Sequence, residues 1–284
     1  MIYLKKFCFP DEDMEYRFIL RIKKQCYNTF YPFKILSKNK LTKLEFDPIT
    51  ILYGGNGSGK STALNIITEK LSIQRESIYN KSSFYQDYLN MCEAEIIGRI
   101  PKCSRNITSD DVFDYMFSVR TVNDGIDDRR EELFADYLET KYAHFKMRSL
   151  EDYEQLKKIN TTRRYTQSKY VKKNLMGNIR ELSNGESAYM YFTEKIVEDG
   201  LYLLDEPENS LSPQKQLELA HFIEESARFF GCQFIISTHS PFFLAMKDAK
   251  IYDLDEMPVQ VKKWTQLESV RFYYDFFKER ESEF

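Results

Sequence analysis

The sequence has no apolar run that approaches the length needed to cross a membrane, which is about 20 residues. Its first residues pass from Met1–Lys6 into the charged segment Asp11–Asp13 without the apolar centre of a signal peptide. We therefore expect a cytoplasmic protein without direct membrane insertion, which would act on a membrane only through a partner.

Cysteine is sparse, with five among 284 residues, and no two of them form a C-x-x-C pair. An odd number without metal-ligand spacing argues against a disulfide framework and against a zinc site. The sequence also lacks repeats, low-complexity segments and the sustained heptads of long coiled-coil arms. It contains no recognisable nuclease constellation. These absences favour a reduced, cytosolic protein whose chemistry lies in other residues.

No excess of either charge identifies a partner. Charged residues make up 30% of the sequence and the net charge is −3, which describes an ordinary protein surface. Aromatic residues are frequent, at 15%, and are mostly Phe and Tyr. A chain of this length can bury a large core, and these rings are suited to fill it.

A glycine-rich stretch is the strongest signal that the sequence does contain. The run GGNGSGKST at residues 54–62 matches G-x-x-x-x-G-K-[ST], the phosphate-binding loop of nucleoside triphosphatases. Its glycines let backbone N–H groups face inward and form a nest for anions. Lys60 is expected to reach the β- and γ-phosphates, and the Ser61 hydroxyl to ligate Mg²⁺. The predicted nucleotide contacts are Gly54, Gly55, Asn56, Gly57, Ser58, Gly59, Lys60, Ser61 and Thr62.

The residues around this loop agree with the motif. The apolar run Thr50–Tyr53 predicts the strand that enters the loop, and apolar residues recur at helical spacing from Ala63 to Leu71. A helix that begins near Lys60 directs the positive end of its dipole at the same phosphates. Upstream, residues 1–53 predict several strands, including one at Arg17–Ile22.

Residues from about 75 to 182 are polar and mostly helical in pattern. They predict a helical subdomain inserted in a single nucleotide-binding domain that spans residues 1–284. Thr108–Asp111 has capping-box spacing and predicts the start of a helix. Arg129–Tyr142 predicts a second helix, and Ser149–Asp152 the cap of a third.

A basic run with two tyrosines lies within residues 157–180. It could neutralise nucleic-acid phosphates while its rings stack on bases, and a solvated helical face explains it equally well. Both interpretations stay open at this point. The members of the run are Lys157, Lys158, Arg163, Arg164, Tyr165, Lys169, Tyr170, Lys172, Lys173 and Arg180.

Two later strands are predicted to end in chemically active residues. Leu201–Asp205 is an apolar strand followed by Glu206, and Cys232–Ser237 is another that leads to His239. Parallel strands carry such residues to one edge of a sheet, where ligands bind. We expect Asp205 to hold Mg²⁺ and Glu206 to orient or deprotonate the attacking water.

Helices are predicted beside these strands. One spans Ala188–Val197. Another begins at Ser212–Pro213, where an N-cap residue precedes proline, and ends at Gly231. The tail from Gln266 to Phe284 contains an aromatic, amphipathic helix that we expect to pack on the core.

In their order and spacing, these motifs resemble those of the ABC-type ATPase family. Gly54–Ser61 matches its Walker A motif and Leu201–Glu206 its Walker B motif. Leu182–Ser187 is similar to the LSGGQ-type signature, Ser210–Ser212 to the D-loop, and His239 to the switch histidine.

A closer resemblance is to small, soluble bacterial AAA family ATPases of ABC type, and to RecF and overcoming-lysogenization-defect proteins. It rests on the runs Leu203–Pro213 and Ser237–Pro241. The sequence departs from the family pattern in two places. The signature reads Ser-Asn-Gly-Glu, and Asn106–Asp111 contains no glutamine where a Q-loop would be expected.

The resemblance implies an α/β fold of P-loop NTPase type. This fold has a mostly parallel core sheet with flanking helices, N-terminal antiparallel strands and an inserted helical subdomain. ATP and Mg²⁺ are the implied cofactors, with Ser61 and Asp205 as metal ligands and Lys60, Glu206 and His239 as catalytic residues. In an ATP-dependent, head-to-tail homodimer, the nucleotide would also be contacted from the second chain by Ser183, Gly185 and Glu186.

The expected function is therefore that of a soluble, Mg²⁺-dependent ATPase that drives a conformational change on a client. DNA maintenance or defence against mobile elements is the expected process. Two alternatives belong to other classes. One is the nucleotide-binding subunit of a membrane transporter, and the other is an ATP-bound regulatory switch with little turnover.

Overall fold

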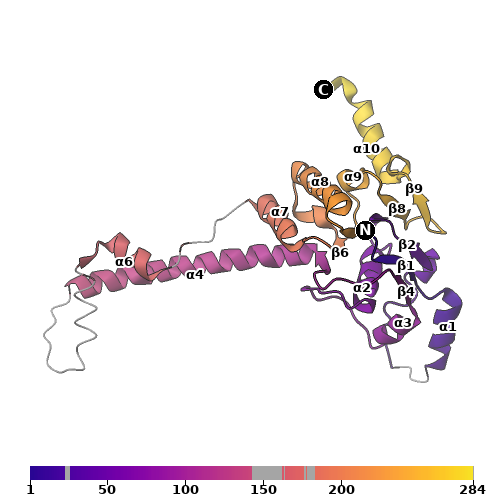
Figure 1. The fold of residues 1–284 in the computed structure, drawn as a ribbon, viewed down its shortest axis with the longest axis horizontal. Helices are drawn as coiled ribbons and strands as arrows, with labels where there is room; N and C mark the ends of the chain where they lie inside the picture. The colour runs from indigo at the N-terminus through magenta and orange to yellow at the C-terminus, as the bar shows by residue number, and fades with distance from the viewer. Residues whose placement is uncertain (23–25, 143–161, 163, 176, 178–182, 284) are drawn as a thin grey trace. The chain divides into compact units, whose positions relative to one another are not determined.

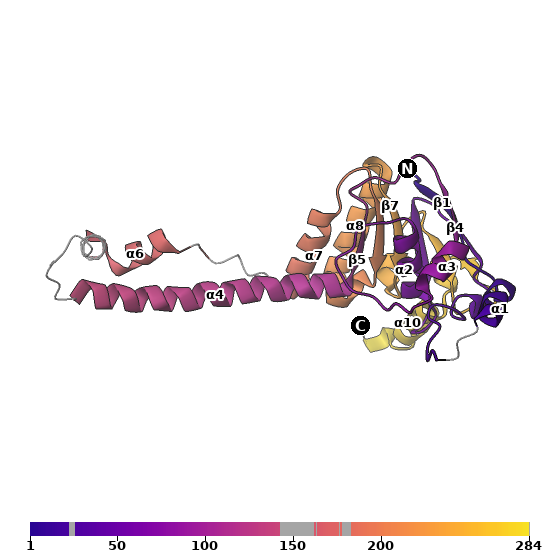
Figure 2. The ribbon, with the colours of Figure 1, turned by 90° about the horizontal axis from the view of Figure 1, so that it is seen from below.

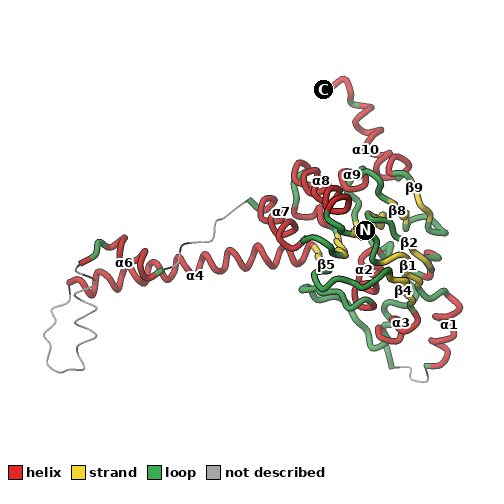
Figure 3. Tube along the Cα trace, viewed as in Figure 1, coloured by secondary structure: helices red, strands yellow, loops and turns green. Residues whose placement is uncertain are grey.

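The computed structural model describes residues 1–22, 26–142, 162, 164–175, 177 and 183–283 (Figure 1). The chain divides into two compact units, one made of Met1–Phe113 and Asn184–Phe284 and the other of Asp114–Ser183. The first unit contains two sheets with helices. The described residues of the second unit form helices and loops (Figure 3). The mostly parallel sheet, the small antiparallel sheet and the helical insertion confirm the predicted fold class.

The main sheet has six strands in the order β5-β6-β7-β3-β8-β9. Its first five strands are parallel, and β9 pairs with β8 in the antiparallel direction. Strands β3 and β7 are buried along their whole length, as expected of a parallel sheet covered on both faces. The bounds are β3 Ile49–Tyr53, β5 Arg105–Thr108, β6 Leu201–Asp205, β7 Gln233–Ser237, β8 Lys250–Asp253 and β9 Gln260–Lys262.

A second, three-stranded antiparallel sheet has β1 (Leu4–Cys8) between β2 (Lys43–Glu45) and β4 (Glu93–Ile96). Strands β4 and β5 lie in the stretch for which the sequence predicted mostly helix. Strand β4 is mostly exposed, so it has no clear apolar alternation, and its pairing with β1 is fixed by contacts far along the chain. One of these contacts is the ion pair between Lys5 and Glu95, at 2.6 Å.

Helix α2 (Lys60–Lys70) joins the two sheets in one core. Leu64 of this helix, Phe7 of β1 and Leu203 of β6 are fully buried in the same cluster. Figure 2 shows α8 (Pro213–Phe229) on the face of the main sheet opposite α2. The remaining helices of this unit that flank the sheets are α3 Tyr85–Met91, α7 Asn184–Lys195 and α9 Pro241–Leu244.

The prediction of a strand at Arg17–Ile22 is wrong, because most of this segment belongs to helix α1 (Glu12–Arg21). The Asp11 side chain caps the helix by accepting from the Met14 N–H at 2.8 Å, and acidic residues fill the first turn. Phe18, Ile19 and Ile22 then pack against the core at helical spacing. The cap at Asp11 lies before the apolar run Arg17–Ile22, so the run by itself does not indicate a helix.

Helix α1 also places one carboxylate in the core. Glu15 is 2% exposed, and its Oε2 accepts from the Lys34 N–H at 2.7 Å and from the Ser37 hydroxyl at 2.8 Å. Among the described residues, no donor reaches its Oε1. Burial is the main cause that raises the pKa of Glu15 above its ordinary value of 4.5.

This raised pKa leads to a prediction for stability. A carboxyl whose pKa is raised on folding favours the folded state below its unfolded pKa, and this contribution is lost as the pH rises through the folded pKa. Glu15→Gln keeps an acceptor for Lys34 and Ser37 but cannot ionise. We therefore expect the free energy of unfolding of Glu15→Gln, minus that of the wild type, to be larger at pH 8 than at pH 5 when both are measured by urea titration.

Glu15→Ala is the matched comparison. It leaves the Lys34 N–H and the Ser37 hydroxyl without this acceptor, so we expect a loss of about 1–3 kcal/mol at both pH values. A difference between Glu15→Gln and the wild type that does not change with pH would contradict the role assigned to ionisation.

Helix α4 (Ser109–Tyr142) is a single helix of 34 residues. Its predicted start is confirmed, since Thr108 and Asp111 form a reciprocal capping box: Thr108 N–H donates to the Asp111 carboxylate at 2.7 Å and Asp111 N–H to the Thr108 hydroxyl at 3.3 Å. The separate helix predicted at Arg129–Tyr142 is instead the continuation of α4. The cap predicted at Ser149–Asp152 lies outside the described residues.

In the second unit, α6 (Gln167–Asn174) packs on α4 through a small cluster that contains Tyr137, Tyr170 and Val171. Tyr170 is 7% exposed and its hydroxyl donates to Asp136 at 3.0 Å, so its ring is not available to stack on a base.

The cations of the basic run that the structure describes are exposed. They are Arg164, Lys169, Lys172 and Lys173. Lys157, Lys158, Arg163 and Arg180 lie outside the described residues.

Helix α10 (Glu268–Glu279) corrects the prediction that the tail helix packs on the core. Val270 is its one buried residue, whereas Tyr273, Phe276 and Phe277 are exposed. The helix is attached near its start, where the hydroxyls of Ser269 and Tyr53 lie 2.9 Å apart. None of the described helices is long and apolar enough to cross a membrane.

Candidate functional site

The glycine-rich loop connects β3 directly to α2. The residue before the helix, Gly59, has φ = +97°, in the region that favours glycine. A Cβ atom at this position would lie 2.8 Å from Leu36 Cδ2, so a side chain here would also force the buried Leu36 side chain to shift. This glycine therefore fixes the point at which the loop turns into the helix.

Lys60, the first residue of α2, directs its side chain back into the loop. Its Nζ donates to the carbonyl oxygens of Gly54 at 2.6 Å and Gly55 at 3.0 Å, and the residue is 4% exposed. The loop is thus folded around a buried ammonium group. A triphosphate bound here would meet this cation together with the first N–H groups of α2.

Two residues that the sequence prediction missed hold the loop from outside. Asn39 Nδ2 donates to the Ser58 carbonyl at 3.0 Å, and both carboxylate oxygens of Asp255 accept from the Gly55 N–H, at 2.8 and 3.0 Å. Asp255 follows the end of β8 and lies 200 positions from Gly55. No local pattern signals such a contact, because it depends on the pairing of β8 with β3.

Three adjacent strands bring the other candidate residues to the same edge of the sheet. Strand β7 lies between β3 and β6, and Ser237 at its end is in register with both Leu52 and Asp205. The residues that follow these strands are the glycine loop, Glu206, and Thr238 with His239. Their meeting at one carboxyl edge, which the sequence predicted, is the usual arrangement of an α/β ligand site.

Ser61 and Asp205 meet directly, with Ser61 Oγ donating to Asp205 Oδ1 at 3.1 Å. Burial is the main cause that raises the pKa of Asp205, and the Ser61 hydrogen bond and the Lys60 charge act in the opposite direction. A hydroxyl and a carboxylate supply the oxygen donors that Mg²⁺ prefers. Mg²⁺ sites commonly use one or two carboxylates with phosphates and water, so this pair fits the ion.

Glu206 begins a sharp turn after β6. Its backbone is left-handed, with φ = 49° and ψ = 55°, and its N–H donates to the Ser237 carbonyl of β7 at 2.9 Å. Its carboxylate Oε2 accepts from Asn209 Nδ2 at 2.9 Å. His239, on the adjacent loop, has a half-exposed side chain that can reach a ligand.

The candidate signature residues lie at the start of α7. Ser183 and Glu186 are exposed, and Gly185 is partly buried beside Ser210 and Ser212. A Cβ atom on Gly185 would be 3.8 Å from the Ser210 carbonyl oxygen, an ordinary contact. The structure therefore places Gly185 of the predicted signature next to the predicted D-loop.

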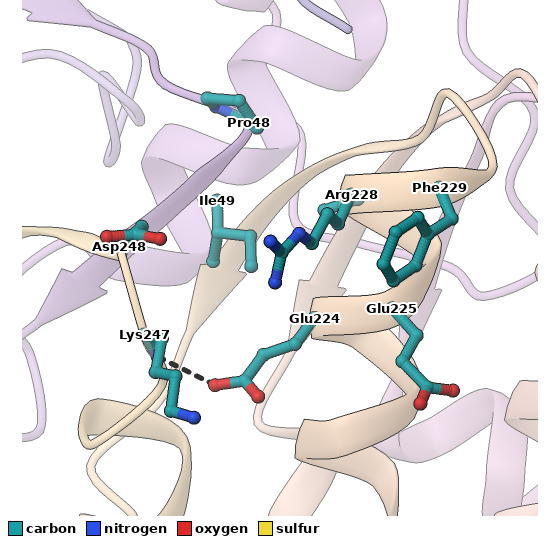
Figure 4. A pocket seen from close by; sticks show the side chains of 9 residues that line it. Pro48, Ile49, Glu224, Glu225, Arg228, Phe229, Lys247 and Asp248 are labelled. Atoms are coloured by element: carbon teal, nitrogen blue, oxygen red, sulfur yellow. Dashed lines mark hydrogen bonds between the residues drawn. The ribbon is translucent and has the colours of Figure 1, made fainter.

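A separate hollow of about 470 Å³ lies at the other end of β3, beside the last turns of α8 (Figure 4). Glu224, Arg228 and Lys247 line it, and the Glu224 carboxylate accepts from the Lys247 N–H at 2.6 Å. Since β3 enters the glycine loop at its opposite end, this hollow is not part of the candidate nucleotide site.

Comparisons with known proteins show what this chain is similar to. Residues 111–245 match the family described as "AAA domain, putative AbiEii toxin, Type IV TA system". This segment includes β6, Glu206 and His239. An uncharacterized ABC transporter ATP-binding protein of Methanocaldococcus jannaschii is 26% identical over 234 residues, which cover 78% of this chain and 81% of that protein. The chain thus has an α/β fold of P-loop NTPase type and is similar in sequence to proteins described as AAA-domain and ABC ATP-binding proteins.

Two solved structures are also similar to this P-loop NTPase chain. One is "An inward-facing conformation of a putative metal-chelate type ABC transporter", with 19% identity, a TM-score of 0.37, and coverage of 80% of this chain and 76% of that one. The other is the Smc head domain of Pyrococcus furiosus, with an extended coiled coil and bound to the C-terminal domain of ScpA. It has 14% identity, a TM-score of 0.40, and coverage of 82% and 94%.

Proposed function

We propose that this protein is a Mg²⁺-dependent ATPase that binds ATP in composite sites of a head-to-tail homodimer. The ATP cycle would drive a conformational change on a client molecule. The observation that carries the proposal is the convergence of Lys60, the Ser61–Asp205 pair and Glu206 at one sheet edge, with His239 on the next loop.

Each of these groups has a part in hydrolysis. Lys60 would bind the β- and γ-phosphates, and Ser61 and Asp205 would hold Mg²⁺, which neutralises phosphate charge when bound. Glu206 would orient the attacking water and accept its proton as the oxygen bonds to the γ-phosphorus. The bond to the bridging oxygen then breaks, and ADP and phosphate leave. His239 would contact the γ-phosphate from the side of β7.

The second half of each site would come from the partner chain. The side chains of Ser183 and Glu186 are exposed and can therefore contact a second protein molecule. Gly185 lies between these two residues in the sequence. Their contact with the γ-phosphate would make ATP part of the interface. Hydrolysis would release this contact, and the unit Asp114–Ser183, which ends at the signature, would transmit the change.

The proposed process is DNA maintenance or defence against mobile elements, as in the soluble branch that includes RecF and overcoming-lysogenization-defect proteins. The family that matches residues 111–245 is described by a toxin of a type IV toxin–antitoxin system, which favours defence. The name of the archaeal relative favours the alternative of a transporter subunit. Stable co-purification of the protein with a membrane protein from its native cells would support that alternative.

The wild-type protein tests the proposal directly. We expect saturable ATP binding in calorimetry and steady-state phosphate release that requires Mg²⁺ and stops when EDTA is added. Kinases, which also transfer phosphoryl groups, typically turn over at about 1–100 s⁻¹, and we expect the rate of phosphate release to be no higher than this range. Tight ATP binding without Mg²⁺-dependent phosphate release would favour the regulatory switch instead.

A further inference from the structure

We propose that one short turn, η3 (Pro207–Ser210), positions two of the candidate catalytic residues, Glu206 and His239. Asn209 would orient the Glu206 carboxylate, and Glu208 would fix the loop that carries His239. The sequence motifs predicted no role for either Asn209 or Glu208. The inference rests on the proposed ATPase function and adds two positioning residues to it.

Asn209 acts on Glu206 from three residues further along the chain. The Asn209 N–H closes the turn onto the Glu206 carbonyl at 3.2 Å, and its side-chain amide donates to Glu206 Oε2 at 2.9 Å. The Glu206 backbone is held at the same time by the Ser237 carbonyl of β7. With Oε2 engaged, Oε1 is the oxygen that would accept the proton of an attacking water.

The backbone of Glu206 is held separately from its carboxylate. A left-handed conformation is strained for a residue other than glycine, so the Ser237 carbonyl and the Asn209 N–H hold the Glu206 backbone in this geometry. The conformation turns the residue sharply off the end of β6. Without the amide of Asn209, the carboxylate would be free to leave this orientation while the backbone stayed in place.

Glu208 contacts the loop that carries His239. It is 7% exposed, and its Oε1 accepts from the Thr238 hydroxyl at 2.7 Å and from the His239 N–H at 3.0 Å. The His239 Nδ1 lies 3.8 Å from the same oxygen. Because two donors of this loop converge on one buried carboxyl oxygen, Glu208 fixes the position of the His239 backbone.

Helix α8 braces the same arrangement. Gln216 Nε2 donates to the Leu211 carbonyl just after η3 at 2.9 Å, and its Oε1 accepts from the Ser240 hydroxyl at 2.6 Å. The turn and the histidine loop are thus tied to each other both directly and through α8. A displacement of η3 would therefore move Glu206 and His239 together.

A double-mutant cycle tests the link between Asn209 and Glu206. We expect Asn209→Ala to lower kcat about 10–100-fold, by analogy with groups that orient metal ligands in active sites, and to leave the Kd for ATP within about twofold. In the Glu206→Gln background, the same substitution should cause no further loss, because the carboxylate that it orients is absent. Asn209→Asp should lower kcat more than Asn209→Ala, since two carboxylates would then repel.

The matched control is Asn90→Ala, which removes another exposed asparagine, on α3, and should leave kcat unchanged. A wild-type kcat for Asn209→Ala, or losses that add in the double mutant, would overturn the inference while leaving the ATPase proposal in place. Absence of any wild-type turnover would overturn both, so the two failures are distinguishable.

A second cycle tests Glu208. Glu208→Ala removes the acceptor of the His239 N–H, and its loss of kcat should disappear in a His239→Ala background. Glu208→Gln keeps an acceptor at this position, so we expect its kcat to be close to that of the wild type. It keeps the test valid if circular dichroism shows that Glu208→Ala does not fold. Additive losses from Glu208→Ala and His239→Ala, in folded proteins, would show that Glu208 acts elsewhere.

Discussion

Lys60→Ala is expected to abolish measurable ATP binding and to leave the fold intact. Lys60 is the only side-chain cation in the loop Gly54–Thr62, and its ammonium group lies among the loop carbonyls where phosphates would bind. Each hydrogen bond from a charged group contributes about 1.5–3 kcal/mol. Loss of two such bonds to phosphate weakens binding by about 100-fold or more.

Lys70→Ala is the matched control in the same helix. Lys70 also donates to a carbonyl, that of Leu89 at 2.8 Å, but it lies at the far end of α2. Calorimetry with ATP and urea unfolding should be run on both variants. We expect a similar, small loss of stability in both, and a loss of ATP binding only for Lys60→Ala. Near wild-type affinity of folded Lys60→Ala would remove the glycine loop from the proposed site.

Local signals in the sequence were sufficient to predict the elements that carry the candidate phosphate site. The strand before Gly54, the helix after Lys60 and the helix that starts at Pro213 each have their own start or stop residue nearby. The capping box at Thr108 likewise predicted the start of α4. Parallel pairing then follows from apolar strands that alternate with helices, and it brings Asp205 to the edge of the glycine loop.

Contacts between distant parts of the chain account for most of what the sequence did not predict. Strand β4 is polar and is recognised as a strand only through its pairing with β1. The Asp255–Gly55 and Asn39–Ser58 contacts require the folded sheet. Helix α4 continues through Gly125, although glycine in a helix costs about 1 kcal/mol, so the two shorter helices were predicted separately.

The aromatic helix α10 shows a different limit. Its amphipathic pattern correctly predicts a helix, but a pattern does not state which surface covers the apolar face. In the structure most of that face is exposed, and Val270 alone is buried. The helix itself is thus confirmed, and its packing on the core is not.

Glu206→Gln is expected to leave little turnover and to trap an ATP-dependent dimer. The substitution keeps the size and hydrogen-bonding ability of the side chain but removes the base and its negative charge. Loss of a general base lowers kcat by about 10²–10⁴-fold. The Lys60 ammonium group and the Ser61–Asp205 pair are untouched, so ATP should still bind. The γ-phosphate would then remain between Ser61 of one chain and Ser183 of the other.

Adding Ser183→Arg to Glu206→Gln should break this dimer, because a bulky cation would occupy the position that contacts the γ-phosphate across the interface. Ser118→Arg is the matched control, since it adds the same side chain to another exposed serine, on α4, and should leave the dimer unchanged. Glu198→Gln, at an exposed position before β6, controls for loss of a carboxylate.

Light scattering with and without Mg-ATP measures the dimer, and a phosphate-release assay measures turnover. Normal hydrolysis by Glu206→Gln would show that the catalytic assignment is wrong. An inactive Glu206→Gln that binds ATP but stays monomeric at high protein concentration would instead contradict the composite site, while the nucleotide pocket of the single chain would stand.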